Sequence, residues 1–113
     1  KHTMQEIREY AESFYAIDFT LDEIRDDYGF HETCQQSVPQ SFEAFFESTG
    51  FEDAVRNAVS IGGDSDTIAA ITGSIAEAFY GIDKEIKDTA FSYLDSYLLE
   101  IAENFVNKFI DKE

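Results

Sequence analysis

The segment with the clearest chemical potential is a short acidic cluster that follows two glycines. Asp64, Asp66 and Thr67 place two carboxylates and a hydroxyl close together in the chain, directly after Gly62 and Gly63. If a helix begins at Asp64, then Asp64 and Thr67 share one face and Asp66 lies beside them. Mg²⁺ and Mn²⁺ prefer oxygen ligands of this kind. The spacing therefore suits a divalent-metal site at the start of a helix.

Helix capping is a simpler interpretation of the same residues. Asp is a favoured N-cap, and acidic side chains in a first turn complement the helix dipole. A cap needs only one Asp, however, whereas here two acids lead into residues 67–76, which carry no charge. Carboxylates packed against a buried helix cost free energy unless something pairs with them. Both interpretations stay open on spacing alone.

The elements that position this cluster are predicted to be helices. One Pro and six Gly in 113 residues leave little room for the many tight turns of a β-sandwich or barrel. Apolar residues instead recur at steps of three or four over residues 4–15, 68–80 and 91–109. We expect an all-α fold of about six helices, with one long loop at about residues 29–38.

Residues that start or stop helices support this prediction. Thr20 followed by Glu23 is a predicted capping box, and so is Thr49 followed by Glu52. A single helix is predicted for the C-terminal stretch up to Phe109. The remaining signals are Pro39 in a first turn, Gly62-Gly63 and Gly81 at helix ends, and Asp83 as the cap of the last helix.

The composition restricts the classes of function. Eight Lys and Arg against 24 Asp and Glu give a formal net charge of −16, which repels phosphate and anionic lipid. Binding to nucleic acid or membrane through a basic patch is therefore excluded. The single Cys34 cannot form an internal disulfide. The polar, acidic start shows no signal peptide, so we expect a cytoplasmic location. The length of the chain predicts one domain over residues 1–113.

Beyond the cluster, the sequence from about Tyr28 to about Ile82 resembles the ADP-ribosylglycohydrolase family. The matching segments, in order, are 33–39, 42–45, 54–60, 62–67 and 69–81. Their order and spacing look like the C-terminal portion of family members. The family's N-terminal metal-ligand cluster, of the Thr-Asp-Asp-Thr type, has no counterpart in this sequence. The resemblance therefore implies the C-terminal part of a longer all-α domain whose N-terminal half is absent.

The resemblance also implies a metal-dependent hydrolase. Family members bind two Mg²⁺ or Mn²⁺ ions, which hold the ribose hydroxyls of ADP-ribose and polarise the glycosidic centre or an attacking water. The substrate is an ADP-ribosylated protein or a small-molecule ADP-ribose conjugate. This chain alone is expected to have little or no activity, because half of the ligands are missing. By resemblance, the metal ligands are Asp64, Asp66 and Thr67, and the residues beside the substrate are Gly62, Gly63, Ser65, Ser37 and Val38.

A non-catalytic acidic helical module is the alternative. The net charge of −16 suits a basic partner. The thinly polar helix predicted over residues 67–80 also needs a cover, either through self-association or through the missing N-terminal half. The two functions differ in metal binding: a hydrolase requires a specific site at Asp64 and Asp66, whereas an acidic surface attracts cations only diffusely and in a salt-sensitive way.

Overall fold

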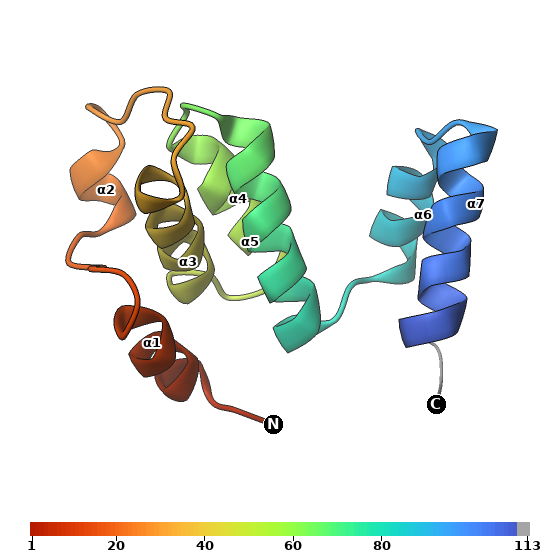
Figure 1. Cartoon of the computed structure of the whole chain (residues 1–113), viewed down its shortest axis with the longest axis horizontal. Helices are drawn as coiled ribbons and strands as arrows, with labels where there is room; N and C mark the ends of the chain where they lie inside the picture. The colour runs from red at the N-terminus through yellow and green to blue at the C-terminus, as the bar shows by residue number, and fades with distance from the viewer. Residues whose placement is uncertain (111–113) are drawn as a thin grey trace. The chain divides into compact units, whose positions relative to one another are not determined.

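The computed structural model describes residues 1–110, and this part of the chain is entirely helical or irregular, without a strand. The all-α prediction is confirmed. The α-helices are α1 (Met4–Glu12), α2 (Leu21–Ile24), α3 (Val38–Phe46), α4 (Phe51–Ser60), α5 (Ser65–Tyr80), α6 (Lys84–Ser92) and α7 (Ser96–Phe105) (Figure 1). A 3₁₀ turn, Cys34–Gln36, precedes α3, and a π-helical turn, Val106–Ile110, follows α7.

The chain divides into two compact units, Lys1–Gly81 and Ile82–Glu113. The first unit contains α1 to α5 together with the acidic cluster, and the second contains α6 and α7. The prediction of a single domain over residues 1–113 stays a prediction.

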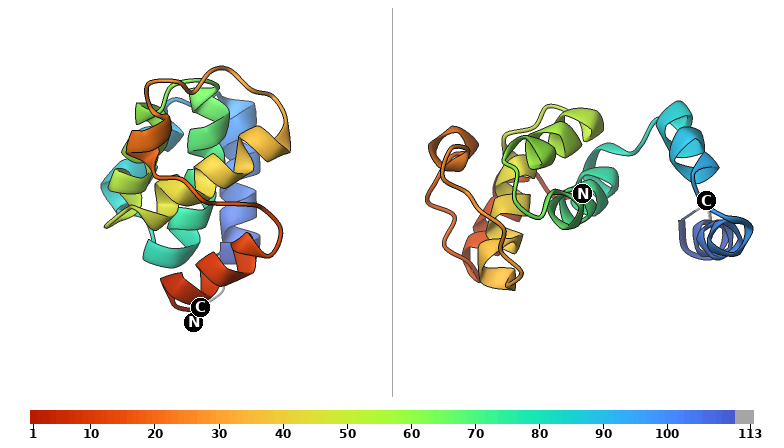
Figure 2. Two further views of the ribbon diagram at one scale, coloured as in Figure 1. Left: turned by 90° about the vertical axis from the view of Figure 1, so that its left-hand side faces the viewer. Right: turned by 90° about the horizontal axis from the view of Figure 1, so that it is seen from above.

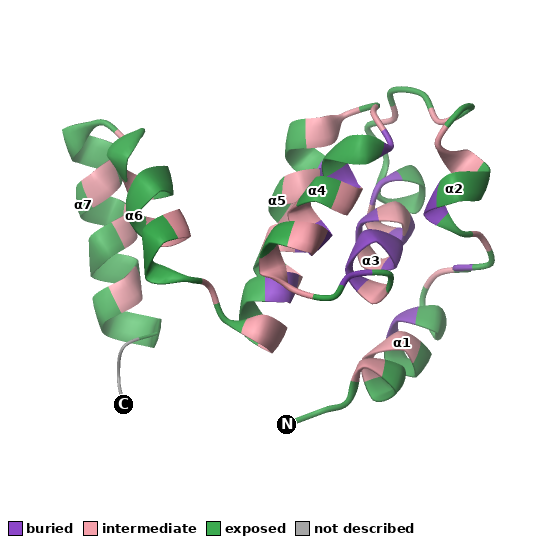
Figure 3. Cartoon of the chain, turned by 180° about the vertical axis from the view of Figure 1, so that it is seen from behind, coloured by how far each residue is buried: buried purple, intermediate pink, exposed green. Residues whose placement is uncertain are grey.

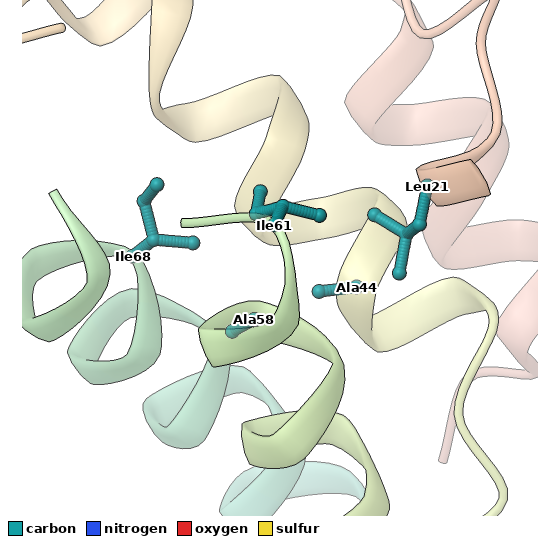
Figure 4. Packing of buried hydrophobic residues seen from close by; sticks show 5 residues of the cluster. All are labelled: Leu21, Ala44, Ala58, Ile61 and Ile68. Atoms are coloured by element: carbon teal, nitrogen blue, oxygen red, sulfur yellow. The ribbon is translucent and has the colours of Figure 1, made fainter. Parts of the chain in front are cut away.

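Helices α3, α4 and α5 pack against one another and form the centre of the first unit (Figures 1 and 2). Small side chains on α3 and α4 allow this close packing. The core cluster beneath the α4–α5 turn consists of Leu21, Ala44, Ala58, Ile61 and Ile68 (Figure 4). Because Ile61 and Ile68 lie on either side of the turn and are both fully buried, they fix its two ends.

A second, aromatic cluster holds the other end of the same helices. The ring of Phe45 on α3 is fully buried, and its centroid lies 5.4 Å from that of Phe79 and 6.0 Å from that of Tyr80. Such edge-to-face pairs stabilise beyond their buried area. On α5 the hydroxyl of Thr72 is also buried, and it donates to the carbonyl of Ser41 at 2.9 Å. The α3–α5 interface therefore leaves this buried hydroxyl satisfied.

Most of the predicted helix signals of the first unit are confirmed, and one is wrong. The backbone N–H of Glu23 donates to the hydroxyl of Thr20 at 3.3 Å, so the first predicted cap is present. The predicted box at Thr49 is wrong: α4 has Gly50 as its N-cap, and the N–H of Thr49 donates instead to the carboxylate of Asp53 at 2.9 Å. The other predicted signals of the first unit are confirmed, with Pro39 in the first turn of α3, Gly62-Gly63 after α4 and Gly81 after α5.

The single C-terminal helix was wrongly predicted, because the chain forms two helices there. Asp83 is the N-cap residue of α6, but its side chain makes no capping hydrogen bond. The chain leaves the helix after Ser92, and Asp95 starts α7 by accepting the N–H of Leu98 at 2.8 Å. Asp favours N-cap positions over helix interiors because its short carboxylate competes for backbone N–H groups. The apolar periodicity continued across this break and concealed it.

The second unit lacks a core in its described part, since no residue of 82–110 is buried (Figure 3). The predicted apolar stripe of α7 lies open: Leu98, Ile101 and Phe105 are 48%, 50% and 55% exposed. We expect amide hydrogens of α7 to exchange at least about 100-fold faster than those of α5, because few buried contacts oppose local opening. Hydrogen-exchange mass spectrometry at neutral pH measures this, and equal protection of the two helices would contradict it.

A buried carboxylate links α3 to α1. Glu43 is only 3% exposed, and its Oε2 lies 3.1 Å from Nη1 of Arg8. Arg8 also bonds the carboxylate of Glu12 at 2.9 Å. The pKa of Glu43 is raised to about 7, mainly by burial and also by a hydrogen bond with Glu47 and the charge of Glu47, while Arg8 offsets part of the rise. Glu43 thus takes up a proton in the folded chain at a pH where the unfolded chain has already lost it.

A Glu43→Gln variant is expected to change how stability depends on pH. A raised carboxyl pKa gives stability that is complete below about pH 4.5 and is lost as the pH rises through about 7. Gln removes this loss, so the variant should gain about 3 kcal/mol at pH 8 and differ little at pH 4.5. Urea unfolding at both pH values tests this against Glu9→Gln, which changes an exposed acid of α1. A Glu43→Gln effect of equal size at both pH values would contradict it.

Candidate functional site

The acidic cluster occupies the turn between α4 and α5. Gly62 and Gly63 have φ angles of 74° and 67°, in the left-handed region that favours glycine. Helix α5 begins at Ser65, so Asp64 is its N-cap residue, one position before the first helical residue. The Asp64 side chain makes no capping hydrogen bond, however. The position is that of a cap, but the carboxylate does not serve as one.

The two carboxylates of the turn lie close enough to interact with each other. A hydrogen bond with the Asp64 side chain, together with backbone N–H groups, lowers the pKa of Asp66. The N–H of Thr67 donates to Oδ1 of Asp66 at 3.0 Å. Asp66 and Thr67 are exposed and Asp64 is half-buried. Asp66 is therefore ionised at neutral pH and accessible from solvent.

Cations of the described residues 1–110 do not pair with these two acids. Among the ion pairs of residues 1–110, none includes Asp64 or Asp66. Arg56, the nearest cation along the sequence, pairs with Glu52 at 2.8 Å. A bound cation would supply the counter-charge that no ion pair of this part of the chain provides.

The residues of the turn carry the oxygen atoms that a hard divalent cation prefers, but they are fewer than the ligands that such a cation takes. Asp64, Asp66 and Thr67 offer carboxylate and hydroxyl oxygens, whereas Mg²⁺ takes six ligands. Within residues 1–110, the structure brings together no group of three or more His, Cys, Asp or Glu side chains that could hold a metal ion. The turn therefore offers some, but not all, of the ligands that such a cation takes.

The two glycines differ in what surrounds them. A Cβ atom at Gly63 would lie 2.6 Å from Cε2 of Tyr28 and 2.7 Å from the carbonyl oxygen of Gly29. A Cβ atom at Gly62 would meet nothing within 4 Å. Gly63 thus allows the chain's own loop to approach closely, because a side chain at this position would collide with Tyr28 and Gly29. Gly62 leaves open space beside the turn.

The predicted substrate loop lies at the same end of the first unit as the turn (Figure 1). Ser37 is 6% exposed, and its hydroxyl donates to the carbonyl of Thr33 at 2.9 Å, so it is already bonded within the loop. Val38, the first residue of α3, is half-buried. Ser65, the first residue of α5, is also half-buried. The structure thus brings the turn and the loop to one end of the unit.

Tyr28 also belongs to this region, although it was not among the site residues predicted from the sequence. Its hydroxyl donates to the carbonyl of Gln36, and its ring packs on the core cluster. Burial raises the pKa of Tyr28, and the negative charge of Asp64 raises it further, which places the two side chains in one electrostatic environment. An aromatic residue directly before Gly29 at the start of the long loop was the available signal.

Comparison with known proteins gives three findings. The model of the ADP-ribosylglycohydrolase family matches residues 1–113, the whole chain. An uncharacterized protein of Archaeoglobus fulgidus is 46% identical over 41 residues, which cover 36% of this chain and 13% of that relative's length. The chain therefore matches much less than two thirds of this relative. No solved structure gives a significant match.

Proposed function

The chain belongs to the ADP-ribosylglycohydrolase family, and we propose that it carries the C-terminal part of a metal-dependent site that hydrolyses the glycosidic bond of ADP-ribose conjugates. The conjugate is an ADP-ribosylated protein side chain or a small molecule. One observation of the structure supports this most: Asp64 and Asp66 lie together at the start of α5, the Asp64 side chain makes no capping bond, and neither acid forms an ion pair within residues 1–110.

The proposed ligands of Mg²⁺ or Mn²⁺ in this chain are Asp64, Asp66 and Thr67. The ion supplies Lewis-acid chemistry and a template for the ribose hydroxyls when it is bound. Asp66 contributes an ionised carboxylate, since its lowered pKa keeps it charged well below neutral pH. The open side of Gly62 leaves room for the sugar, and Gly63, Ser65, Ser37 and Val38 border the same end of the unit.

We further propose that this chain is inactive alone. Three ligating side chains leave the coordination sphere of a hard cation incomplete. The remaining ligands would come from the N-terminal half of the enzyme, as the family resemblance implies. The match of this chain to only 13% of its Archaeoglobus fulgidus relative is compatible with this proposal.

Metal-dependent binding of ADP-ribose tests the proposed function. Isothermal titration of the chain with ADP-ribose should give binding at least about tenfold tighter in Mn²⁺ than in EDTA, because an ion held by Asp64, Asp66 and Thr67 would supply Lewis-acid chemistry to the ribose hydroxyls. AMP is the matched control, since it lacks the second ribose. Equal affinity in Mn²⁺ and EDTA, or no binding at millimolar ADP-ribose, would refute the proposal.

A second candidate is a non-catalytic acidic binding module. Two observations favour it: the net charge of −16 and the open apolar stripe of Leu98, Ile101 and Phe105 on α7. Exposed apolar stripes mark interaction surfaces. Sedimentation velocity over rising protein concentration tests its self-associating form, in which the sedimentation coefficient should increase. A coefficient that stays constant for a monomer would remove that form.

A further inference from the structure

Two segments far apart in sequence converge on one side chain. The first is the loop from Gly29 to Val38, which carries the candidate substrate residues Ser37 and Val38. The second is the Gly62–Thr67 turn, which carries the candidate metal ligands. Helices α3 and α4 separate the two segments in the chain, and Tyr28 contacts both segments.

Tyr28 is fixed by backbone and core contacts of its own. Its N–H donates to the carbonyl of Ile24 at 2.8 Å, which ties it to the end of α2. Its ring packs on the buried cluster that contains Ile61 and Ile68, the two residues that flank the turn. The side chain therefore starts from a well-anchored position.

Each end of the Tyr28 side chain holds a different segment. The ring edge lies directly beside Gly63, since a Cβ atom at Gly63 would be only 2.6 Å from Cε2 of Tyr28. The hydroxyl donates to the carbonyl of Gln36, directly before Ser37, and so closes the loop on itself. The ring centroid of His31, inside the loop, lies 5.2 Å from that of Tyr28.

We propose that Tyr28 is a positioning residue, whose ring supports the Gly62–Thr67 turn and whose hydroxyl holds the Gly29–Val38 loop at a fixed distance from it. The inference rests on the proposed function in one respect, namely that the two segments bind metal and substrate. The hydroxyl and the ring of Tyr28 have separate roles in this proposal. Removal of the hydroxyl should release the loop alone, whereas removal of the ring should disturb the turn as well.

The experiment compares Tyr28→Phe and Tyr28→Leu with the unmodified chain, and Tyr10→Phe serves as control because Tyr10 lies exposed on α1. In Tyr28→Phe we expect amide exchange of residues 29–37 to rise about fivefold, the value of one net hydrogen bond. Affinity for ADP-ribose in saturating Mn²⁺ should fall by a similar factor. Mn²⁺ affinity, followed by electron paramagnetic resonance, should stay within about twofold, and only Tyr28→Leu should weaken it further.

The outcomes separate this inference from the proposed function. Faster loop exchange and weaker ADP-ribose binding with unchanged Mn²⁺ affinity in Tyr28→Phe support positioning. Unchanged loop exchange overturns it, and so does faster exchange with unaltered ADP-ribose affinity. Faster exchange throughout α3, α4 and α5 would show general destabilisation and also overturns it. If the unmodified chain binds no ADP-ribose, the proposed function fails, while loop exchange in Tyr28→Phe still decides whether the hydroxyl holds the loop.

Discussion

A Gly63→Ala variant is expected to lose about 3 kcal/mol of its free energy of unfolding, a large part of the total for a small domain. Two costs add at this position. The left-handed φ of 67° costs an L-residue about 1–2 kcal/mol. The new Cβ would also meet Tyr28 and the backbone of Gly29 at 2.6 Å and 2.7 Å, and overpacking of this kind costs about 1–3 kcal/mol. Urea unfolding followed by circular dichroism measures the loss.

Gly62→Ala is the matched control for this prediction. Gly62 has a similar φ of 74°, but a Cβ there would meet nothing within 4 Å. We therefore expect it to lose only the backbone cost, about 1 kcal/mol. If both variants lost the same amount, close contact between Gly63 and the Tyr28 loop would not exist in solution.

An Asp66→Asn variant is expected to lose at least about tenfold in Mn²⁺ affinity, because a neutral amide replaces an ionised ligand without a change of shape. Asp64→Asn should have a similar effect, since the two carboxylates adjoin. Helix α5 should persist in both variants, because the Asp64 side chain makes no capping bond and Asn is an equally good N-cap. Electron paramagnetic resonance of free Mn²⁺ in about 0.15 M salt gives the affinities.

Asp18→Asn is the control for charge. Asp18 is an exposed acid in the loop between α1 and α2, and its substitution lowers the net negative charge by the same amount. Diffuse attraction to a surface of net charge −16 would respond equally to all three variants. Mn²⁺ affinity that falls alike in Asp18→Asn and Asp66→Asn would therefore argue against a specific site.

Local signals predicted much of the helical structure because they act over one or two turns. Pro39, Thr20 and the glycines after α4 and α5 each fix backbone geometry by their own chemistry, and each lies where expected. The break before Asp95 was missed, since the apolar spacing is the same on both sides of it. The box at Thr49 was wrong because Asp53, one residue beyond the predicted partner, competes for the N–H of Thr49.

The candidate site was predictable only in part. Asp64, Asp66 and Thr67 are adjacent in the chain, so sequence spacing alone brings them together. The approach of Tyr28 to Gly63 depends on the packing of α2 and the long loop against the core, which no local pattern encodes. The buried Glu43 on α3 was likewise hidden, because its partner Arg8 lies on a different helix.

The family model matches the whole chain. None of the helices formed by residues 1–110 has the length and apolar character needed to span a bilayer.

The proposed function depends on a specific metal site at the start of α5. Paramagnetic broadening of amide NMR signals by substoichiometric Mn²⁺ tests it most directly, because the effect identifies residues. We expect the amide signals of residues 62–68 to broaden first in about 0.15 M salt, before those of other acidic segments such as 22–27 and 83–88. Broadening that spreads evenly over all acidic segments would contradict it.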